Sequence, residues 1–69
     1  MDPNKMTLSE IIAAFRARTV RFKLKDGTNR TIFVEEIENE DDDQPETIFM
    51  GSTENEDVWI SDVVSAKEL

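Results

Sequence analysis

The chain has 69 residues, contains no cysteine and no histidine, and carries a net charge of −8 from 16 acidic and 8 basic residues. This length allows one domain, residues 1–69, with a small hydrophobic core that no disulfide can stabilise. Without histidine or cysteine a zinc-type site is not expected, no serine has a visible general base, and no pocket makes any pair of carboxylates special. We therefore expect no metal site, no cofactor, no catalytic residue and no enzyme.

A helix over residues 7–18 is the first element that the chain predicts, after a flexible N-terminus of residues 1–6. The segment Thr7–Glu10 reads TLSE, a capping box in which the side chains of Thr7 and Glu10 bind each other's backbone amides. Apolar residues follow at helical spacing and form one stripe: Leu8, Ile11, Ile12 and Phe15.

A β-hairpin follows the helix. Residues 20–25 alternate between apolar and basic side chains, so that one face carries Arg21 and Lys23. Asp26-Gly27 then predicts a tight turn, because glycine supplies the positive φ that such turns need. The returning strand, residues 29–37, is apolar on both faces, and its phase breaks near Glu35. This break predicts a bulge and a strong bend.

The rest of the chain predicts an acidic loop and three short strands. The loop, residues 39–45, reads NEDDDQP, and the strands span residues 46–51, 57–60 and 63–66. Its acids lack the spacing of a calcium loop, so we expect it to be solvated. The expected fold is therefore mainly β, with an N-terminal α-helix followed by a five-stranded, strongly bent, SH3-like small barrel over residues 19–66.

This layout resembles the Sm-like proteins (Sm, Lsm and Hfq), in which a helix also precedes five strands and a glycine comparable to Gly27 lies in the first hairpin. The resemblance implies the barrel fold and a tendency to form rings. The RNA-binding signatures of that family are absent: no Asp-x-apolar-Asn motif stands between the second and third strands, and residues 59–62 read WISD in place of a Tyr-Lys-His-like segment. RNA binding is therefore kept only as an alternative.

Alternation assigns the apolar strand residues to two faces. The expected barrel interior consists of Val20, Phe22, Leu24, Ile32, Val34, Ile48, Met50, Val58 and Ile60. The expected outer residues, which we take as interface candidates, are Phe33, Phe49, Trp59 and Val64. Either the helix stripe covers this outer group, or a second subunit or a target protein does so with Trp59 as its anchor.

The charges are divided along the chain. Six of the eight basic residues lie between Arg16 and Arg30, whereas residues 31–62 hold twelve acids and no base. A contact between unlike surfaces of identical chains is therefore expected, with Arg21 and Lys23 facing acids of a neighbour. The expected acids, also interface candidates, are Glu54, Glu56 and Asp57.

These observations predict a non-enzymatic, acidic protein-binding or scaffold module that acts as a homo-oligomer, because a core of this size usually needs the support of a partner subunit. The acidic surface disfavours nucleic acid and leaves a basic protein as a further candidate partner. Two alternatives stay open: an Sm-like RNA-binding protein, and an acidic inhibitor that mimics nucleic acid and blocks a basic protein. Neither the apolar run of a signal peptide nor a membrane-spanning stretch is visible, so we expect a cytoplasmic protein.

Overall fold

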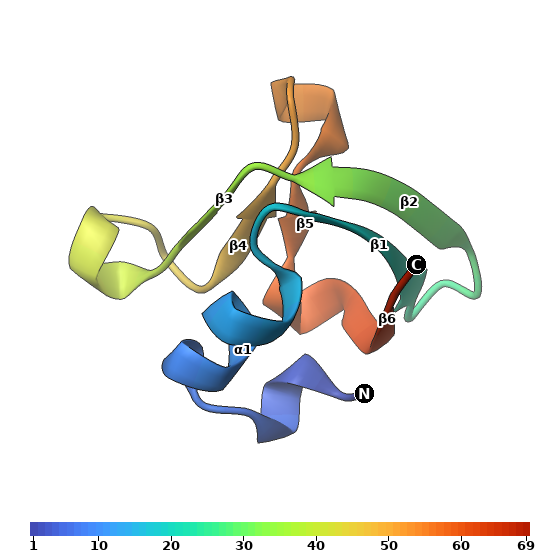
Figure 1. The fold of residues 1–69 in the computed structure, drawn as a ribbon, viewed down its shortest axis with the longest axis horizontal. Helices are drawn as coiled ribbons and strands as arrows, with labels where there is room; N and C mark the ends of the chain where they lie inside the picture. The colour runs from blue at the N-terminus through green and yellow to red at the C-terminus, as the bar shows by residue number, and fades with distance from the viewer.

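The computed structural model describes residues 1–69 as one helix followed by two small antiparallel sheets (Figure 1). The helix α1 spans Leu8–Phe15. The strands are β1 (Arg18–Leu24), β2 (Asn29–Val34), β3 (Glu36–Glu38), β4 (Ile48–Met50), β5 (Val58–Trp59) and β6 (Val63–Glu68). One sheet has the order β2-β1-β6 and the other the order β3-β4-β5. The architecture is therefore α+β.

The helix α1 starts at the predicted capping box. The Thr7 amide donates to Glu10 Oε1 at 2.8 Å, and the Glu10 amide donates to Thr7 Oγ1 at 3.2 Å. The helix ends earlier than expected, because Ala17 adopts a left-handed conformation with φ 62° and turns the chain into β1. The Ala17 amide donates to the Val34 carbonyl at 2.7 Å, which fixes this turn beside β2. No helix of the protein is long and apolar enough to cross a membrane.

The predicted hairpin joins β1 to β2, with Lys23 opposite Asn29 as the last pair of the ladder. Gly27 has φ 90°, which confirms that the turn requires the conformational freedom of glycine. The Asp26 carboxylate accepts hydrogen bonds from the Thr28 hydroxyl at 2.6 Å and from the Thr28 amide at 2.9 Å. This local ring of hydrogen bonds orders the turn.

Acidification is expected to weaken this turn. The Thr28 hydroxyl and then the Thr28 amide hold the pKa of the Asp26 carboxyl below its ordinary value of 3.8. Such a carboxyl stabilises the fold above its unfolded pKa, and this contribution is lost as the pH falls through the lowered folded pKa. Carboxyl-carbon NMR is expected to show a midpoint below 3.8 that rises in Thr28→Val. A midpoint that Thr28→Val leaves unchanged would contradict the hydroxyl as the main cause.

The second strand of the hairpin is bent, as the sequence predicts. The bend lies at Glu35, where the ladder with β1 ends and the ladder with β4 begins. The Glu35 amide donates to the Met50 carbonyl at 2.9 Å, so the bent residue already belongs to the second sheet. The segment β2–β3 therefore passes from one sheet to the other and places their inner faces against a common core. No ladder joins β5 to β6, and the expected closed five-stranded barrel is not found.

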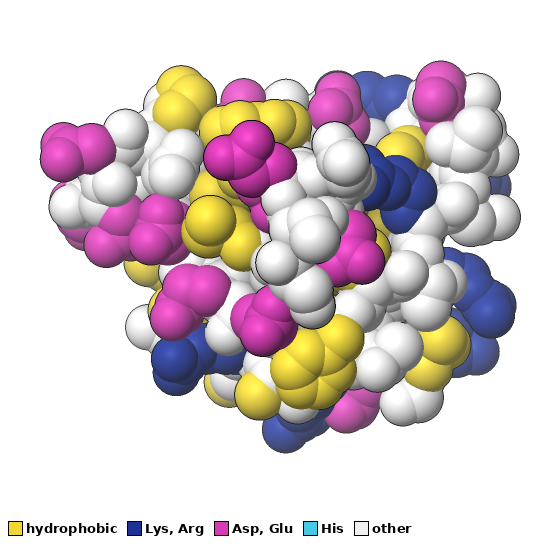
Figure 2. All heavy atoms as spheres, turned by 90° about the horizontal axis from the view of Figure 1, so that it is seen from above, with side chains coloured by type: hydrophobic (Ala, Val, Ile, Leu, Met, Phe, Trp, Pro, Cys, Tyr) yellow, Lys and Arg dark blue, Asp and Glu magenta, His cyan; other side chains and the backbone are white.

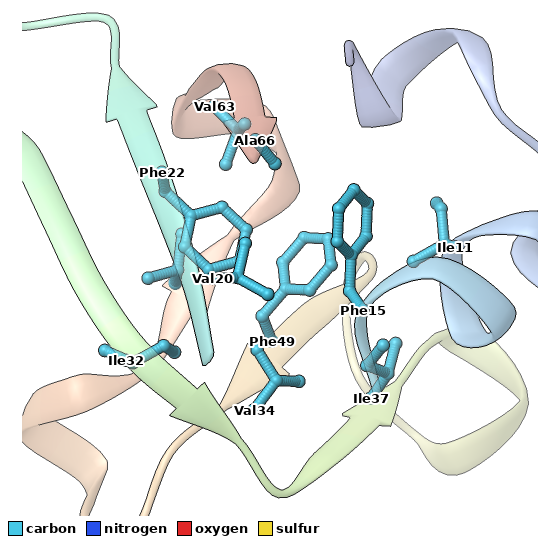
Figure 3. Close-up of a cluster of buried hydrophobic side chains, with 11 residues drawn as sticks. Ile11, Phe15, Val20, Phe22, Ile32, Val34, Ile37, Phe49, Val63 and Ala66 are labelled. Atoms are coloured by element: carbon cyan, nitrogen blue, oxygen red, sulfur yellow. The ribbon is translucent and has the colours of Figure 1, made fainter. Parts of the chain in front are cut away.

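The core between the sheets is built around Phe49 (Figure 3). Its ring centroid lies 4.8 Å from that of Phe22 and 6.1 Å from that of Phe15, the latter in an edge-to-face arrangement. Eleven buried residues from α1 and all six strands form this cluster: Ile11, Phe15, Val20, Phe22, Ile32, Val34, Ile37, Phe49, Val58, Val63 and Ala66. The helix closes the cluster at one side by inserting Ile11 and Phe15.

The sequence-based face assignment of β4 is wrong. Phe49, expected outside, is fully buried, because the register pairs it with Ile37 and Val58 on the inner face. Ile48 and Met50, expected inside, lie on the outer face of the β3-β4-β5 sheet. Ile48 is nevertheless buried there, opposite Trp59.

Residues 1–6, expected to be flexible, instead pack against β6. Pro3 is buried in the short 3₁₀ turn Pro3–Lys5. The Ala66 amide donates to the Met1 carbonyl at 2.7 Å, and Asn4 Nδ2 donates to the Val63 carbonyl at 3.0 Å. This segment therefore covers an edge of β6 that would otherwise be open to another strand.

Candidate interaction surface

The outer face of the β2-β1-β6 sheet is exposed and carries three basic side chains. The register places Arg21 of β1 between Thr31 of β2 and Lys67 of β6, all on the same face. Lys23 lies on this face as well, two residues along β1. We call this surface the basic sheet face, and its exposed members are Thr19, Arg21, Lys23, Thr31, Phe33 and Lys67.

The cations of the basic sheet face have no acidic partner. The two ion pairs of the protein join Arg16 to Glu36 at 3.0 Å and Arg18 to Glu68 at 3.1 Å. Neither pair includes Arg21, Lys23 or Lys67, although the chain contains 16 acids. The positive charge of this face is therefore not neutralised within the chain.

Arg21 and Lys67 are direct cross-strand partners on this face. Like charges directly opposite each other destabilise an antiparallel pair, whereas opposite charges stabilise it. An acid at either position would stabilise the isolated fold, so this arrangement does not serve stability. It is instead the arrangement that an anionic partner would stabilise.

Lys67→Glu is accordingly expected to raise the free energy of unfolding by roughly 0.2–1 kcal/mol, because Arg21 gains an opposite charge across the ladder. Urea denaturation followed by the fluorescence of Trp59 measures this change. Lys5→Glu is the matched control, since it changes the net charge equally at an exposed position away from the basic sheet face. An equal gain in both variants would assign the effect to net charge and not to the Arg21–Lys67 pair.

Sequence reasoning found one aromatic member of this face and missed one basic member. Phe33 was expected outside, and it lies there with half of its surface exposed, opposite Thr19 and on the same face as Arg21. Lys67 was missed because the last strand was expected to end at Ala66, whereas β6 continues to Glu68. Alternation along the two hairpin strands was sufficient to place Phe33, but no local signal pairs Lys67 with Arg21.

The four outer interface candidates do not form one patch. Phe33 lies on the basic sheet face, whereas Phe49 is buried in the core. Trp59 is half-buried on the outer face of the other sheet, beside Ile48. Val64 is exposed where the β1–β6 register shifts. Helix α1 covers Phe49, whereas Phe33 and Val64 stay exposed and Trp59 stays half-buried. The helix therefore does not cover the whole outer group, which is the role that the alternation suggested.

The acidic candidates lie near the 3₁₀ turn Glu54–Glu56. Glu56 is engaged within the chain, because its Oε1 accepts from the Ser52 amide at 2.8 Å. The Arg30 guanidinium donates to the backbone carbonyls of Asn55 and Asp57. A cation is thus placed among these acids, which reduces their combined negative field.

A second acidic group lies in the loop between β3 and β4. Asn39 and Asp42 form a capping box at the N-terminal end of the 3₁₀ turn Glu40–Asp42, and Asp43 follows in a left-handed conformation. We call residues Glu40–Asp43 the acidic turn. No group of acidic side chains in the protein is arranged to hold a metal ion.

The two kinds of charge are unevenly distributed over the molecule. In Figure 2, carboxylate side chains are most frequent at the left end and the centre, and most visible Lys and Arg side chains lie toward the right, with a few of each kind elsewhere. In Figure 1 the loop between β3 and β4 lies at the left, and the β1–β2 hairpin lies at the right. The one pocket lies at the turn end of this hairpin, and only one of its four lining residues is hydrophobic: Leu24, Lys25, Asp26 and Asp62.

The chain matches no known protein-family model, no curated protein and no solved structure. The Sm-like resemblance stays a prediction.

Proposed function

We propose that the protein is a non-enzymatic, cytoplasmic protein-binding module whose basic sheet face docks an acidic surface of another protein molecule. The observation that carries this proposal is the unpaired Arg21–Lys67 couple, two like charges held opposite each other on an exposed face. Carboxylates of a partner would lie between cations that now repel each other. Binding then removes an unfavourable contact as well as forming favourable ones.

A protein partner fits this surface better than a nucleic acid does. The net charge of −8 repels a long polyanion, whereas a protein presents its carboxylates over a short distance. At 0.1 M salt, screening limits the interaction between exposed charges to about 10 Å. A small acidic surface that docks on the basic sheet face therefore interacts with the cations of that face more than with the net charge of the whole chain. The half-exposed ring of Phe33 adds an apolar contact beside the cations.

We also propose that the two sheets are an opened form of a small SH3-like or Sm-like barrel, and that the protein works as a homo-oligomer. Support comes from the segment β2–β3, which bends at Glu35 and serves both sheets, and from α1, which precedes the strands and covers the core.

RNA binding is the second candidate function, and one observation favours it. Phe33 lies on the same face as Arg21 and Lys23, and an exposed aromatic ring beside basic residues is the arrangement on which unpaired bases stack. The two candidates differ in the anion they need, carboxylate or phosphate.

Amide NMR titrations with the short acidic peptide tetra-L-glutamate and with polyuridine RNA distinguish them. We expect tetra-L-glutamate to shift the amides of Thr19, Arg21 and Lys67, with an affinity that falls as salt rises. Lys67→Glu is expected to abolish these shifts, and Lys5→Glu to keep them. Shifts on this face with RNA alone would replace the proposal by the second candidate, and no shift with either ligand would overturn both.

A further inference from the structure

We propose that the acidic surface docking on the basic sheet face is the acidic turn of a second copy of this chain, so that copies associate head to tail. This inference rests on the proposed function, since it requires that the basic sheet face bind protein carboxylates. It names the partner and the segment of the partner that makes the contact.

The acidic turn is held in one conformation by its own hydrogen bonds. Asn39 Oδ1 accepts from the Asp41 amide at 3.0 Å, and Asp42 Oδ2 accepts from the Asn39 amide at 3.1 Å. The loop is also fastened at its base, where Gln44 Nε2 donates to Glu38 Oε1 at 3.0 Å. Little backbone conformational entropy remains to be lost when such a turn docks on a partner.

Three carboxylates of this turn are free to meet a partner. Glu40, Asp41 and Asp43 are exposed, and their side chains take part in none of the hydrogen bonds or ion pairs of the chain. The basic sheet face offers three equally free cations, Arg21, Lys23 and Lys67. The two groups match in number and have opposite charge.

A chain cannot satisfy this match by itself. No ion pair joins the acidic turn to the basic sheet face, and the loop that carries the turn lies at the end of the molecule opposite the β1–β2 hairpin (Figure 1). A contact between two different surfaces of identical chains is head to tail, and it generates rings or filaments.

The acidic residues that the sequence predicted for this contact, Glu54, Glu56 and Asp57, are weaker candidates for docking on the basic sheet face. Glu56 is engaged by the Ser52 amide, and Arg30 binds the carbonyls of Asn55 and Asp57. Docking of this region would bring the Arg30 guanidinium toward the cations of the basic sheet face. No cation lies in the acidic turn, which therefore presents the stronger negative surface.

Charge exchange between the two surfaces tests the inference. The face-reversed variant is Arg21→Glu/Lys67→Glu and the turn-reversed variant is Glu40→Lys/Asp41→Lys. The combined variant carries all four changes and keeps the net charge of −8. Sedimentation and light scattering at low salt measure self-association, and far-ultraviolet circular dichroism checks that each variant is folded.

We expect each reversed variant to self-associate about 100-fold more weakly than the wild type, because like charges then meet at the contact. The combined variant is expected to recover self-association, and so is an equimolar mixture of the two reversed variants. Lys5→Glu/Lys25→Glu, which changes the net charge as much as the face-reversed variant, is expected to associate like the wild type.

Three outcomes would overturn the inference. The first is a wild type that stays monomeric at millimolar concentration, and the second is a folded combined variant that fails to recover self-association. The third is recovery of self-association when the face-reversed variant carries Glu54→Lys/Asp57→Lys in place of the turn changes. A monomeric wild type whose basic sheet face still binds tetra-L-glutamate overturns only the inference. A face that binds no such acidic peptide overturns the proposed function itself.

Discussion

Phe49→Ala is expected to lower the free energy of unfolding by about 3–5 kcal/mol, the range for truncating a buried phenylalanine. The Phe49 ring is fully buried, and its centroid lies 4.8 Å from the Phe22 ring centroid and 6.1 Å from the Phe15 ring centroid. Its removal leaves a cavity at the centre of the cluster that joins the two sheets to α1. Urea denaturation followed by the fluorescence of Trp59 measures the loss.

A milder variant and a matched control keep this prediction testable. A domain of this size has a stability of only about 3–5 kcal/mol, so Phe49→Ala is expected to be largely unfolded in water. Phe49→Leu fills most of the space and is expected to remain folded with a smaller loss. Phe33→Ala removes the same ring from the exposed basic sheet face, and the expected loss is below about 1 kcal/mol. Equal losses at Phe33 and Phe49 would contradict the core described above.

The contrast between these two phenylalanines shows where sequence reasoning stops. Residues 48–50 read Ile-Phe-Met, and three consecutive apolar side chains support either face of a strand equally well. The choice is made by the pairing of Phe49 with Ile37, a residue twelve positions away that lies beyond the bend at Glu35. Such a pairing is a property of the fold and leaves no signal in the local pattern.

Features that depend on neighbouring residues were predictable. The capping box at Thr7 and Glu10, the positive φ at Gly27 and the break at Glu35 each follow from chemistry within a few residues. Alternation also predicted that Arg21 and Lys23 share one exposed face. These local features are therefore enough to predict the helix start, the hairpin and the bent strand without any tertiary contact.

Features that depend on distant residues were missed. Lys67 joins Arg21 only because β6 runs beside β1, at a separation of 46 residues. The N-terminal segment was expected to be flexible because its contacts, such as that of Asn4 with the Val63 carbonyl, are even more distant in sequence, at 59 residues. The candidate surface is therefore predictable in its β1 half and not in its β6 half.

Phe15→Ala is expected to lower the free energy of unfolding by about 3 kcal/mol and to remove the contribution of α1 to the circular dichroism spectrum. The helix has only eight residues, and an isolated helix of this length is unstable in water. Phe15 is fully buried and packs edge to face on Phe49, so its ring anchors α1 to the core. Losing the ring removes buried area and leaves a cavity beneath the helix.

Ile12→Ala is the matched control, because Ile12 belongs to the same predicted stripe but is 36% exposed. Its truncation is expected to lower the free energy of unfolding by less than about 1 kcal/mol. The milder pair Phe15→Leu and Phe49→Leu, taken singly and together, measures the coupling between the two rings. An edge-to-face pair is expected to contribute about 0.5–1.5 kcal/mol beyond its buried area. A loss below about 0.5 kcal/mol in Phe15→Ala, the size of a neutral surface change, would show that α1 is not docked on the core in solution.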